Sequence, residues 1–305
     1  MMVSFFETIW FAPKWYHWLV AILLLPISIL WGIIAYFRRS FITPQDLQIP
    51  IISLGNLIVG GSGKTPFLIS LAKELNAKNI HIVSRGYGRV SSGLIEVSHK
   101  GKILTTVEKS GDEAMLIASS LPSASVIVSE NRTNGIIRAK ELGADIILLD
   151  DGHNQISIKK LDIILEPNHI KNYLPMPSGP FREYWFMSKK ADLILKDEVD
   201  FKREVEFENL TKKMLLVTAI ANPSRLDRYL PNGIIDRYFQ KDHSYFDEVK
   251  IANKMSKIGA NSILVTEKDF VKMSAFKLPI SKIKLKLEIN SDVISTVNRY
   301  IEGYK

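Results

Sequence analysis

The chain has 305 residues, of which 46% are hydrophobic and 24% are charged, so it can bury the core of one large domain or of two smaller ones. It contains no cysteine, which excludes disulfides, thiolate zinc sites and cysteine nucleophiles and fits a reducing compartment. The formal net charge of +8 suits anionic partners such as nucleotides and anionic lipids. Nucleic acid is the least favoured partner, because no run of Lys and Arg is interleaved with aromatic residues.

An apolar segment near the N-terminus, residues 19–37, reads LVAILLLPISILWGIIAYF and carries no charge. Its length, its aromatic flanks and the Arg38-Arg39 pair at its end are typical of a membrane segment whose downstream side faces the cytoplasm. A signal peptide is disfavoured, since Lys14 is the only basic residue before the segment and no cleavage site follows. Pro26 and the minimal length leave open whether the helix spans the bilayer or lies in its interface. A buried helix of a soluble domain is the remaining alternative.

A glycine-rich turn lies downstream of this segment. It reads Ile-Val-Gly-Gly-Ser-Gly-Lys-Thr over residues 58–65, between an apolar run at 49–54 and an apolar helical pattern at 67–75. Strand, glycine-rich turn and helix form the setting of a phosphate-binding loop, in which backbone N–H groups and a helix N-terminus converge on a phosphate. The pattern predicts a nucleoside triphosphate site, with Lys64 at the β- and γ-phosphates and the Thr65 hydroxyl on Mg²⁺.

The match to the usual pattern is incomplete, because that pattern begins with glycine and this chain has Ile58 there. An ordinary glycine-rich turn is the alternative. The phosphate interpretation is favoured, since the other glycines, the lysine and the threonine are all present in the right setting. The predicted nucleotide-binding residues are Ile58, Val59, Gly60, Gly61, Ser62, Gly63, Lys64 and Thr65.

Short apolar runs then alternate with helical patterns, which predicts an α/β fold with a mainly parallel sheet of the P-loop NTPase type and flanking helices. The expected strands and helices of this part are 49–54, 66–76, 80–84, 112–120, 125–128, 132–142, 145–149 and 162–165, with a hairpin at 94–107.

Five Pro and Gly residues between 167 and 180 indicate a boundary, and later strands and helices predict a second, smaller α/β domain. Its expected elements are strands at 192–195, 214–218 and 262–266 and helices at 224–230 and 246–258. We therefore expect a membrane-associated segment at 1–40, a P-loop domain at 41–166 and a smaller domain at 167–289. A last helical pattern at 290–305 is expected to rejoin the P-loop domain.

An acidic pair, Asp150-Asp151, follows the apolar strand and precedes Gly152. In P-loop proteins, a carboxylate at such a strand end holds Mg²⁺ directly or through water. A plain Asp-Gly turn is the alternative, but two adjacent aspartates at a buried strand end favour metal binding because unpaired buried charge is costly.

Five further residues carry a weaker signal. Asp112-Glu113 opens a predicted helix and is, taken alone, a helix cap. Arg85 follows a strand at the edge where ligands bind in doubly wound folds, so it is a candidate for contacting a substrate phosphate. His243 and Arg182 carry little weight on chemistry alone, since a lone His–Asp neighbour pair such as Asp242-His243 is usually structural, often a cap.

Together, these motifs resemble the tetraacyldisaccharide 4'-kinases, the lipid A 4'-kinases of Gram-negative bacteria, over nearly the whole chain. The motifs that carry the resemblance are Gly55-Asn56 with residues 59–66, Ser84-Arg-Gly-Tyr-Gly88, Gly111-Asp-Glu113, Leu149-Asp-Asp-Gly152, Pro177-Ser-Gly-Pro-Phe-Arg182, Ala221-Asn-Pro223 with Arg225, Asp242-His243 and Thr266-Glu-Lys-Asp269. Each is short, but their order and spacing behind an apolar segment are specific. Ile58 is then no anomaly, because the loop of this family does not begin with the usual glycine.

The resemblance implies an ATP-dependent kinase that phosphorylates the 4'-hydroxyl of a tetraacylated glucosamine disaccharide 1-phosphate at the cytoplasmic face of the bacterial inner membrane. No nucleic acid and no obligate protein partner are implied. The roles it implies are catalysis by Asp112 as base with His243 and Lys64; Mg²⁺ binding by Thr65, Glu113, Asp150 and Asp151; and substrate or phosphate contact by Arg85 and by Arg182, which belongs to a mobile lid.

The chain departs from the family pattern in two places. The family reads Asp-Asp-Gly-Phe/Leu-Gln-His, whereas this chain has His153-Asn-Gln155 after the glycine, so the family histidine is replaced by Gln155 and His153 is the only candidate substitute. Arg89 stands where the family has a second glycine; it is expected either to contact a substrate phosphate or to be exposed.

A membrane-associated P-loop ATPase or GTPase switch without lipid kinase activity is the principal alternative. The sequence 266–269, Thr-Glu-Lys-Asp, bears a superficial likeness to the guanine-specifying motif Asn-Lys-x-Asp, which does not occur in the chain.

Overall fold

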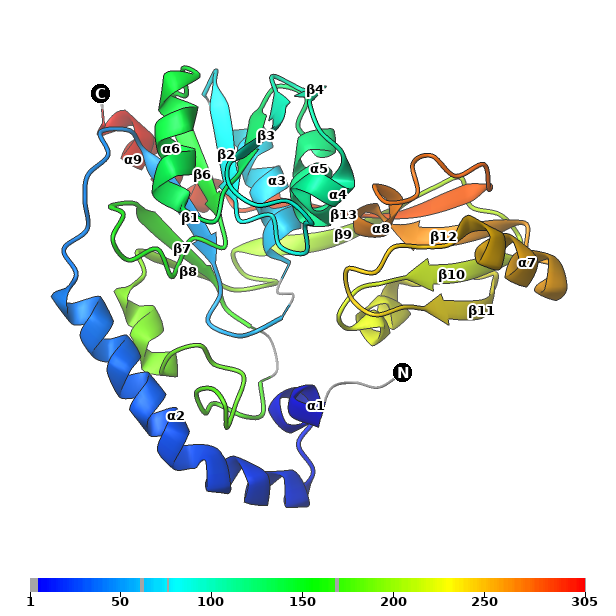
Figure 1. Ribbon diagram of the computed structural model, residues 1–305, viewed down its shortest axis with the longest axis horizontal. Helices are drawn as coiled ribbons and strands as arrows, with labels where there is room; N and C mark the ends of the chain where they lie inside the picture. The colour runs from blue at the N-terminus through cyan, green and yellow to red at the C-terminus, as the bar shows by residue number, and fades with distance from the viewer. Residues whose placement is uncertain (1–4, 61–62, 76, 168–169, 305) are drawn as a thin grey trace.

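The computed structural model describes residues 5–60, 63–75, 77–167 and 170–304, which form two sheets and an N-terminal helical arm (Figure 1). The larger sheet has eight strands in the order β4-β3-β5-β2-β6-β1-β7-β8. All neighbouring strands are parallel except at β3, which is antiparallel to β4 and β5. These strands are β1 (Ile51–Gly55), β2 (Ile80–Ser84), β3 (Ile95–His99), β4 (Lys102–Ile103), β5 (Ser125–Val128), β6 (Ile146–Asp150), β7 (Leu161–Leu165) and β8 (Leu193–Leu195).

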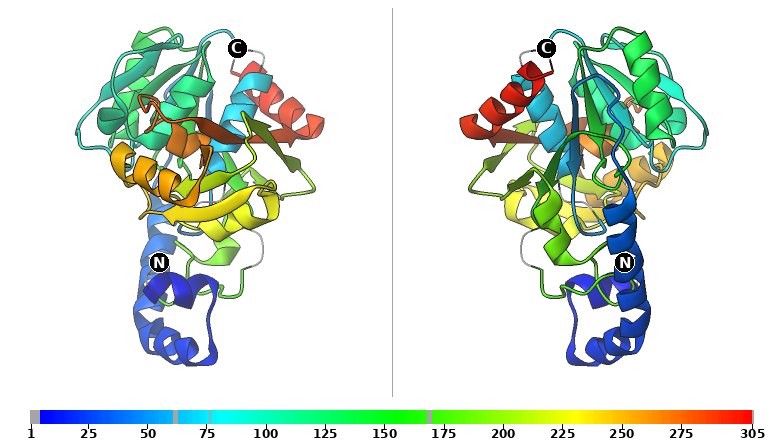
Figure 2. Two further views of the ribbon diagram at one scale, coloured as in Figure 1. Left: turned by 90° about the vertical axis from the view of Figure 1, so that its right-hand side faces the viewer. Right: turned by 90° about the vertical axis from the view of Figure 1, so that its left-hand side faces the viewer.

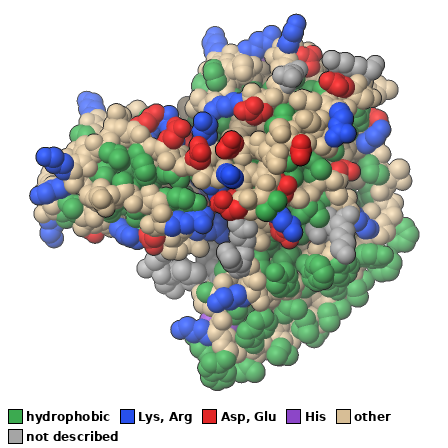
Figure 3. All heavy atoms as spheres, turned by 180° about the vertical axis from the view of Figure 1, so that it is seen from behind, with side chains coloured by type: hydrophobic (Ala, Val, Ile, Leu, Met, Phe, Trp, Pro, Cys, Tyr) green, Lys and Arg blue, Asp and Glu red, His purple; other side chains and the backbone are tan. Residues whose placement is uncertain are grey.

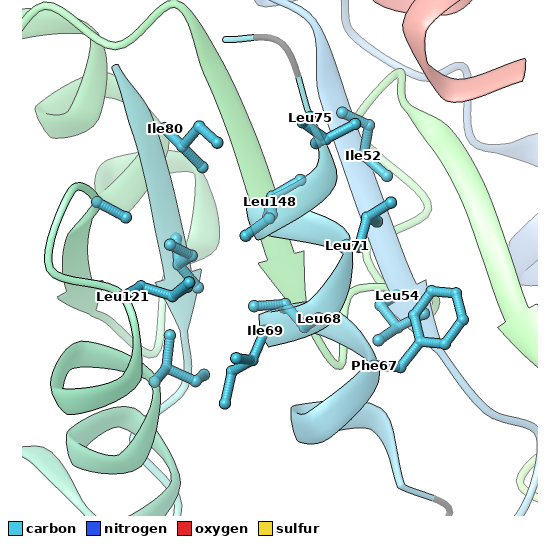
Figure 4. Close-up of a cluster of buried hydrophobic side chains, with 14 of the residues drawn as sticks. Ile52, Leu54, Phe67, Leu68, Ile69, Leu71, Leu75, Ile80, Leu121 and Leu148 are labelled. Carbon is cyan, nitrogen blue, oxygen red and sulfur yellow. The ribbon is translucent and has the colours of Figure 1, made fainter. Parts of the chain in front are cut away.

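Helices cover both faces of this sheet, which explains why its central strands are apolar throughout. Successive strand residues face opposite layers: Ile52 packs with α3 (Lys64–Glu74) and α5 (Asp112–Ser120), whereas Ile51 packs with α6 (Arg132–Glu141). Figure 4 shows the first of these layers, with Leu68 and Leu71 of α3 against the strands. A short helix, α4 (Val107–Ser110), precedes α5. The expected α/β fold is confirmed.

The smaller sheet has the strand order β11-β10-β12-β13-β9, parallel except where β9 pairs with β13. Its elements are β9 (Phe201–Glu208), β10 (Met214–Thr218), η2 (Pro223–Tyr229), β11 (Ile234–Phe239), α7 (Glu248–Ile258), β12 (Ser262–Thr266), α8 (Glu267–Phe270) and β13 (Ile280–Ile289). Its core lies between the sheet and α7, where Ile251 and Met255 pack against strand residues.

The long antiparallel pair β9–β13 joins the two lobes and ends beside α3 (Figure 1). At that end, Phe201 and Leu287 are buried in the core of the larger lobe, and the backbone N–H of Leu287 donates to Ser70 Oγ at 3.3 Å. The chain then continues into α9 (Ser291–Glu302), whose Val293 and Val297 belong to the same core. The smaller lobe is therefore connected to the larger one by two adjacent strands.

One strand lies on the other side of the expected domain boundary. β8 pairs with β7 in the larger sheet, so the chain passes to the smaller sheet after residue 195, later than the boundary at 167 that its Pro and Gly residues suggest. The composition break marks a long irregular segment with a 3₁₀ helix, η1 (Trp185–Lys190), within the larger lobe.

The N-terminal arm consists of α1 (Phe5–Phe11) and α2 (Trp15–Phe41), and it projects from one end of the molecule (Figure 2). Among the described residues, α2 is the one helix long and apolar enough to cross a membrane, and it continues through Pro26. Its buried residues form one stripe: His17, Ala21, Ser28, Gly32 and Ala35.

The other sides of α2 carry large apolar residues that remain exposed, such as Leu23 (78%) and Phe41 (80%). In Figure 3 apolar side chains accordingly cover the end of the molecule that α2 forms. A helix of a soluble core would bury such residues. The buried-helix alternative is therefore not supported.

Candidate active site

The glycine-rich turn connects β1 to α3, as expected. Gly60 and Gly63 have φ angles of 99° and 82°, which residues with a Cβ atom rarely adopt. Gly63 is the N-cap of α3. Lys64 Nζ donates to Asn56 Oδ1 at 3.0 Å and lies 3.4 Å from Asp151 Oδ1. Of the predicted nucleotide-binding residues, Gly61 and Ser62 lie outside the described residues. The turn thus presents its lysine toward the end of β6.

Ile58 replaces glycine because this position is a packing site here. Its side chain is buried with Leu57, Ile164 and Phe181, and it forms an antiparallel bridge with Phe181. The next residue, Val59, donates its backbone N–H to the carbonyl of Pro180 at 2.9 Å. The first residues of the turn are therefore paired with a segment about 120 positions downstream, which a local motif cannot reveal.

The acidic pair lies beside the turn because β6 is the parallel neighbour of β1, with Asp150 in register with Leu54. Asp150 is buried and accepts a hydrogen bond from Ser84 Oγ at 3.0 Å. Burial and the negative charges of Glu113 and Asp151 raise the pKa of Asp150 to about 6. The charge of Lys64 acts in the opposite direction but does not outweigh burial and the two neighbouring carboxylates.

Asp151 has the opposite electrostatic environment. Burial acts to raise its pKa, but the charges of Lys64 and Arg182 outweigh burial and hold that pKa below its ordinary value. Arg182 Nη1 lies 3.0 Å from Asp151 Oδ2. Asp151 also has a positive φ of 51°, uncommon outside glycine and concentrated at functional sites. Arg182 is thus placed at the acidic pair, as a contact of Asp151.

Asp150 and Asp151 place carboxylate oxygens, which suit Mg²⁺, at the end of β6. Within the described part of the chain, no three carboxylate or imidazole groups converge as a ready-made metal cage. Thr65, Glu113, Asp150 and Asp151 nevertheless fit a magnesium ion held mainly by phosphate and water, because Mg²⁺ keeps several waters and needs only one or two carboxylates. The raised pKa of Asp150 is the observation that favours a cation there.

The predicted pair of Asp112 and His243 is brought together across the two lobes. His243 Nδ1 lies 3.0 Å and 3.1 Å from the two carboxylate oxygens of Asp112. Asp112 opens α5 after Gly111, and His243 follows β11 with a positive φ of 62°. The ring of Tyr87 lies 5.0 Å from that of His243. A histidine that means little in sequence is therefore a partner of a buried carboxylate.

Two lysines of the smaller lobe, which the sequence did not single out, also face Asp112. Lys268 Nζ lies 3.0 Å from Glu113 and 3.8 Å from Asp112, and the buried Lys272 Nζ lies 3.5 Å from Asp112. Burial would raise the pKa of Asp112, but the hydrogen bond from His243 and the two lysine charges outweigh it and lower that pKa. The motif at 266–269 was the sequence signal that could have identified Lys268. Thr266 is the N-cap of α8, the short helix that carries this lysine.

Asp269 of the same motif anchors Lys272. It is fully buried and accepts hydrogen bonds from Thr218 Oγ1 at 2.6 Å and Thr266 Oγ1 at 2.8 Å, while Lys272 Nζ lies 3.2 Å away. The likeness of this motif to a guanine-specifying sequence is therefore only superficial, because the Asp269 carboxylate is already bonded to Thr218, Thr266 and Lys272.

The two arginines after β2 behave differently. Arg85 is exposed at the end of the strand. Arg89 is neither exposed nor directed to the acidic pair: its side chain is 3% exposed and pairs with Glu130 and with the carbonyl of Gly93. The expectation that Arg89 is exposed was therefore wrong, because a nearby carboxylate offers it a local partner. Its contact with a substrate phosphate stays a prediction.

His153, the candidate substitute for the family histidine, has both ring nitrogens engaged by other side chains. It is buried, with Nδ1 2.6 Å from Asp162 Oδ2 and Nε2 3.0 Å from Arg39 Nη2. Because arginine only donates, Nε2 accepts and Nδ1–H donates to Asp162. Its neighbour Gln155 takes part in the following turn through its backbone. His153 therefore links β7 to the end of α2.

The chain is similar to known proteins of one family over most of its length. The family model described as LpxK, tetraacyldisaccharide-1-P 4'-kinase, matches residues 20–212. A tetraacyldisaccharide 4'-kinase of Helicobacter acinonychis is 43% identical over 98% of this chain and 96% of its own. One of Aliarcobacter butzleri is 42% identical over 97% and 96%.

A solved structure is also similar. The crystal structure of "apo" form LpxK from Aquifex aeolicus in complex with ATP matches with a TM-score of 0.77 and 27% identity. The match covers 93% of this chain and 99% of the other. The likeness therefore extends over both lobes and is not limited to the phosphate-binding turn.

Proposed function

The chain belongs to the tetraacyldisaccharide-1-P 4'-kinase family, and we propose that the residues gathered at the turn, β6 and α5 carry out its phosphoryl transfer. It is a lipid A biosynthesis kinase that transfers the γ-phosphate of ATP to the 4'-hydroxyl of a tetraacylated disaccharide. The observation that supports this assignment of roles is the convergence of Lys64, Asp151, Asp112 and His243 from separate elements.

The triphosphate of ATP is held by the turn and α3. Backbone N–H groups at the turn and the positive end of the α3 dipole attract the phosphates, and Lys64 is already positioned by Asn56 and Asp151 to meet them. When phosphate arrives, it replaces these two partners. Arg182 remains next to Asp151, where it adds a second positive charge.

Mg²⁺ supplies charge neutralisation at the β- and γ-phosphates when bound. Thr65, Asp150 and Asp151 would hold it, and Glu113 lies close enough to raise the pKa of Asp150. Glu113 is paired with Lys268. The ammonium group of Lys268 therefore compensates the charge of the Glu113 carboxylate in this structure.

Asp112 acts as the base that accepts the proton of the sugar hydroxyl, with His243 as its partner. A hydroxyl is far from ionised at neutral pH, so proton removal in the transition state lowers the barrier. His243, Lys268 and Lys272 hold Asp112 as an anion and fix its orientation. Since these three residues come from the smaller lobe, catalysis requires the two lobes to be together.

The exposed apolar face of α2 places the enzyme at a lipid surface. Trp15 and Trp31 are exposed at this helix, and Arg38 and Arg39 lie at its end. We assign this surface to the cytoplasmic face of the inner membrane, since the basic end precedes the catalytic lobes. Because one stripe of α2 is buried against polar backbone of the larger lobe, the helix is expected to lie in the interface.

The test is transfer of radiolabelled phosphate from ATP to the disaccharide lipid, comparing wild type with Lys64→Ala. We expect Lys64→Ala to lose at least about 100-fold in kcat, because its charge stabilises the transferring phosphoryl group. Lys73→Ala, at the other end of α3, is the matched control. Near-native turnover of Lys64→Ala would refute the mechanism, and ATP hydrolysis without lipid phosphorylation would favour the switch alternative.

A further inference from the structure

A short segment, residues 177–184, lies between α2 and the phosphate-binding turn; we call it the strap. We infer that α2, by docking on the strap, holds Arg182 and the start of the turn in position for phosphoryl transfer, so that Gly32, Arg39 and Glu183 are positioning residues. The inference rests on the proposed function of the turn. It makes α2 part of the catalytic machinery as well as the lipid-facing surface.

The inner side of the strap is bonded to the turn. The backbone N–H of Arg182 donates to the carbonyl of Leu57 at 2.8 Å, and that of Val59 donates to the carbonyl of Pro180 at 2.9 Å. Phe181 is 2% exposed and packs on Ile58. A displacement of the strap therefore displaces the first residues of the turn, because the two segments share backbone hydrogen bonds.

The outer side of the strap is bonded to α2. Ser178 Oγ donates to the carbonyl of Ala21 at 2.7 Å, and its backbone N–H donates to Ser28 Oγ at 2.9 Å. Trp31 Nε1 donates to the carbonyl of Arg182 at 2.9 Å. Arg182 of the strap therefore has three partners. Its carbonyl accepts from α2, its backbone N–H donates to the turn, and its side chain contacts Asp151.

A buried ion pair between Arg39 and Glu183 fixes the end of α2 next to Arg182. Arg39 makes two hydrogen bonds to Glu183, of 2.8 Å and 3.0 Å, and the two side chains are 9% and 5% exposed. Arg39 also contacts His153, two positions after Asp151. Two-point pairing of this kind fixes orientation as well as distance. The end of α2 is therefore bonded to Glu183, which follows Arg182, and to His153, which lies two positions after Asp151.

These contacts exceed what a membrane anchor requires. An anchor needs an apolar outer face, whereas the strap-facing stripe of α2 combines small residues with hydrogen-bonding groups. Gly32 is the closest point: a Cβ there would lie 2.4 Å from the ring of Tyr184, whose hydroxyl donates to the carbonyl of Ile29. A larger side chain at position 32 must therefore displace the ring of Tyr184, which breaks its contact between the strap and α2.

The experiment compares Gly32→Leu with Ser40→Leu, which adds the same side chain at an exposed site of the same helix. Full-length protein in detergent is assayed for kcat with the disaccharide lipid, and vesicle binding is measured by flotation with phosphatidylethanolamine and phosphatidylglycerol. We expect Gly32→Leu to keep vesicle binding within about twofold while kcat falls about tenfold, a change of 1.4 kcal/mol. Ser40→Leu should preserve both. Leucine is a better helix former than glycine, so a loss is not explained by the helix itself.

A second pair of variants covers poor folding of Gly32→Leu. Arg39→Met should lower kcat at least about tenfold, and Arg39→Lys should recover part of it because a charge remains. Adding Tyr184→Ala to Gly32→Leu should restore kcat by opening space. Full kcat in both Gly32→Leu and Arg39→Met overturns the inference. A parallel loss of vesicle binding and kcat also overturns it, since α2 would then act only by recruitment.

The result can be separated from failure of the proposed function. If wild-type protein does not phosphorylate the lipid, binding of a fluorescent ATP analogue replaces turnover as the measurement. Because the strap is bonded to the turn, Gly32→Leu should then weaken nucleotide binding at least about threefold. Unchanged nucleotide affinity would overturn the inference even in that case.

Discussion

At the scale of single residues, neighbouring carboxylates in this site have different environments. Asp150 is buried among negative charges, and its pKa is raised to about 6, whereas Lys64 and Arg182 lower the pKa of Asp151. Sequence reasoning identified the pair but treated its members as equivalent, because their difference arises from residues on other elements. The same holds for Lys272, whose meaning depends on a contact with Asp112 in the other lobe.

Lys160 provides a residue-scale test of burial. Burial lowers the pKa of its ammonium group from 10.5 to about 8, although Nζ donates to the carbonyl of Gln155 at 2.7 Å. Because the folded protein favours the neutral amine, this group adds stability as pH rises from about 8 to 10.5. That contribution is absent below about pH 8.

We therefore expect the melting temperature of wild type to rise, relative to Lys160→Met, between about pH 8 and pH 10. Differential scanning fluorimetry of both proteins across this range measures the difference. The other lysines and the tyrosines titrate in both proteins, so the comparison cancels their contribution to the pH dependence. A constant difference across the range would show that the folded-state pKa of Lys160 is ordinary.

At the scale of elements, the sequence predicted those whose signal is local. The strands at 80–84 and 125–128 were confirmed as β2 and β5, and the turn and α3 follow directly from their glycines and apolar spacing. β8 was assigned to the wrong sheet, since a three-residue strand carries no information about its partner. The apolar segment at 19–37 was found, but α2 is longer, because the helix continues into the polar residues that dock on the larger lobe.

The β9–β13 pair connects the two lobes, and Leu287 is one of its buried contacts with the core of the larger lobe. Leu287→Ala should lower the free energy of unfolding by about 2 to 4 kcal/mol through loss of buried area and the cavity left behind. Urea unfolding, monitored by tryptophan fluorescence, measures this change.

The matched control is Lys286→Ala, one position away on the exposed side of the same strand. It should change the free energy of unfolding by less than about 0.5 kcal/mol. Equal effects of the two substitutions would mean that β13 does not rest on the core of the larger lobe.

At the scale of the whole molecule, the catalytic pair is divided between two lobes. Resemblance to a family identified Asp112 and His243 as partners, but neither periodicity nor spacing could place them within 3.0 Å, because that distance depends on how the lobes meet. The same limit applies to the strap, whose contacts with α2 join residues about 150 positions apart.

A double-mutant cycle tests whether the pair acts as one unit. Asp112→Asn and His243→Gln should each lower kcat by about 100-fold, and the double variant should be little worse than either, because a broken pair loses its function once. The readout is phosphate transfer at saturating ATP. Multiplicative losses in the double variant would show that the two residues act independently.

The path of the chain through the two lobes has a consequence for biosynthesis. Val293 and Val297 complete the core that β1 and α3 begin, yet they are translated only after every strand of the smaller sheet. During synthesis the smaller lobe therefore has all of its strands while the core of the larger lobe still lacks α9. Nascent protein stalled before α9 should leave the nucleotide lobe open to chaperones and proteases, although most of that lobe emerged first.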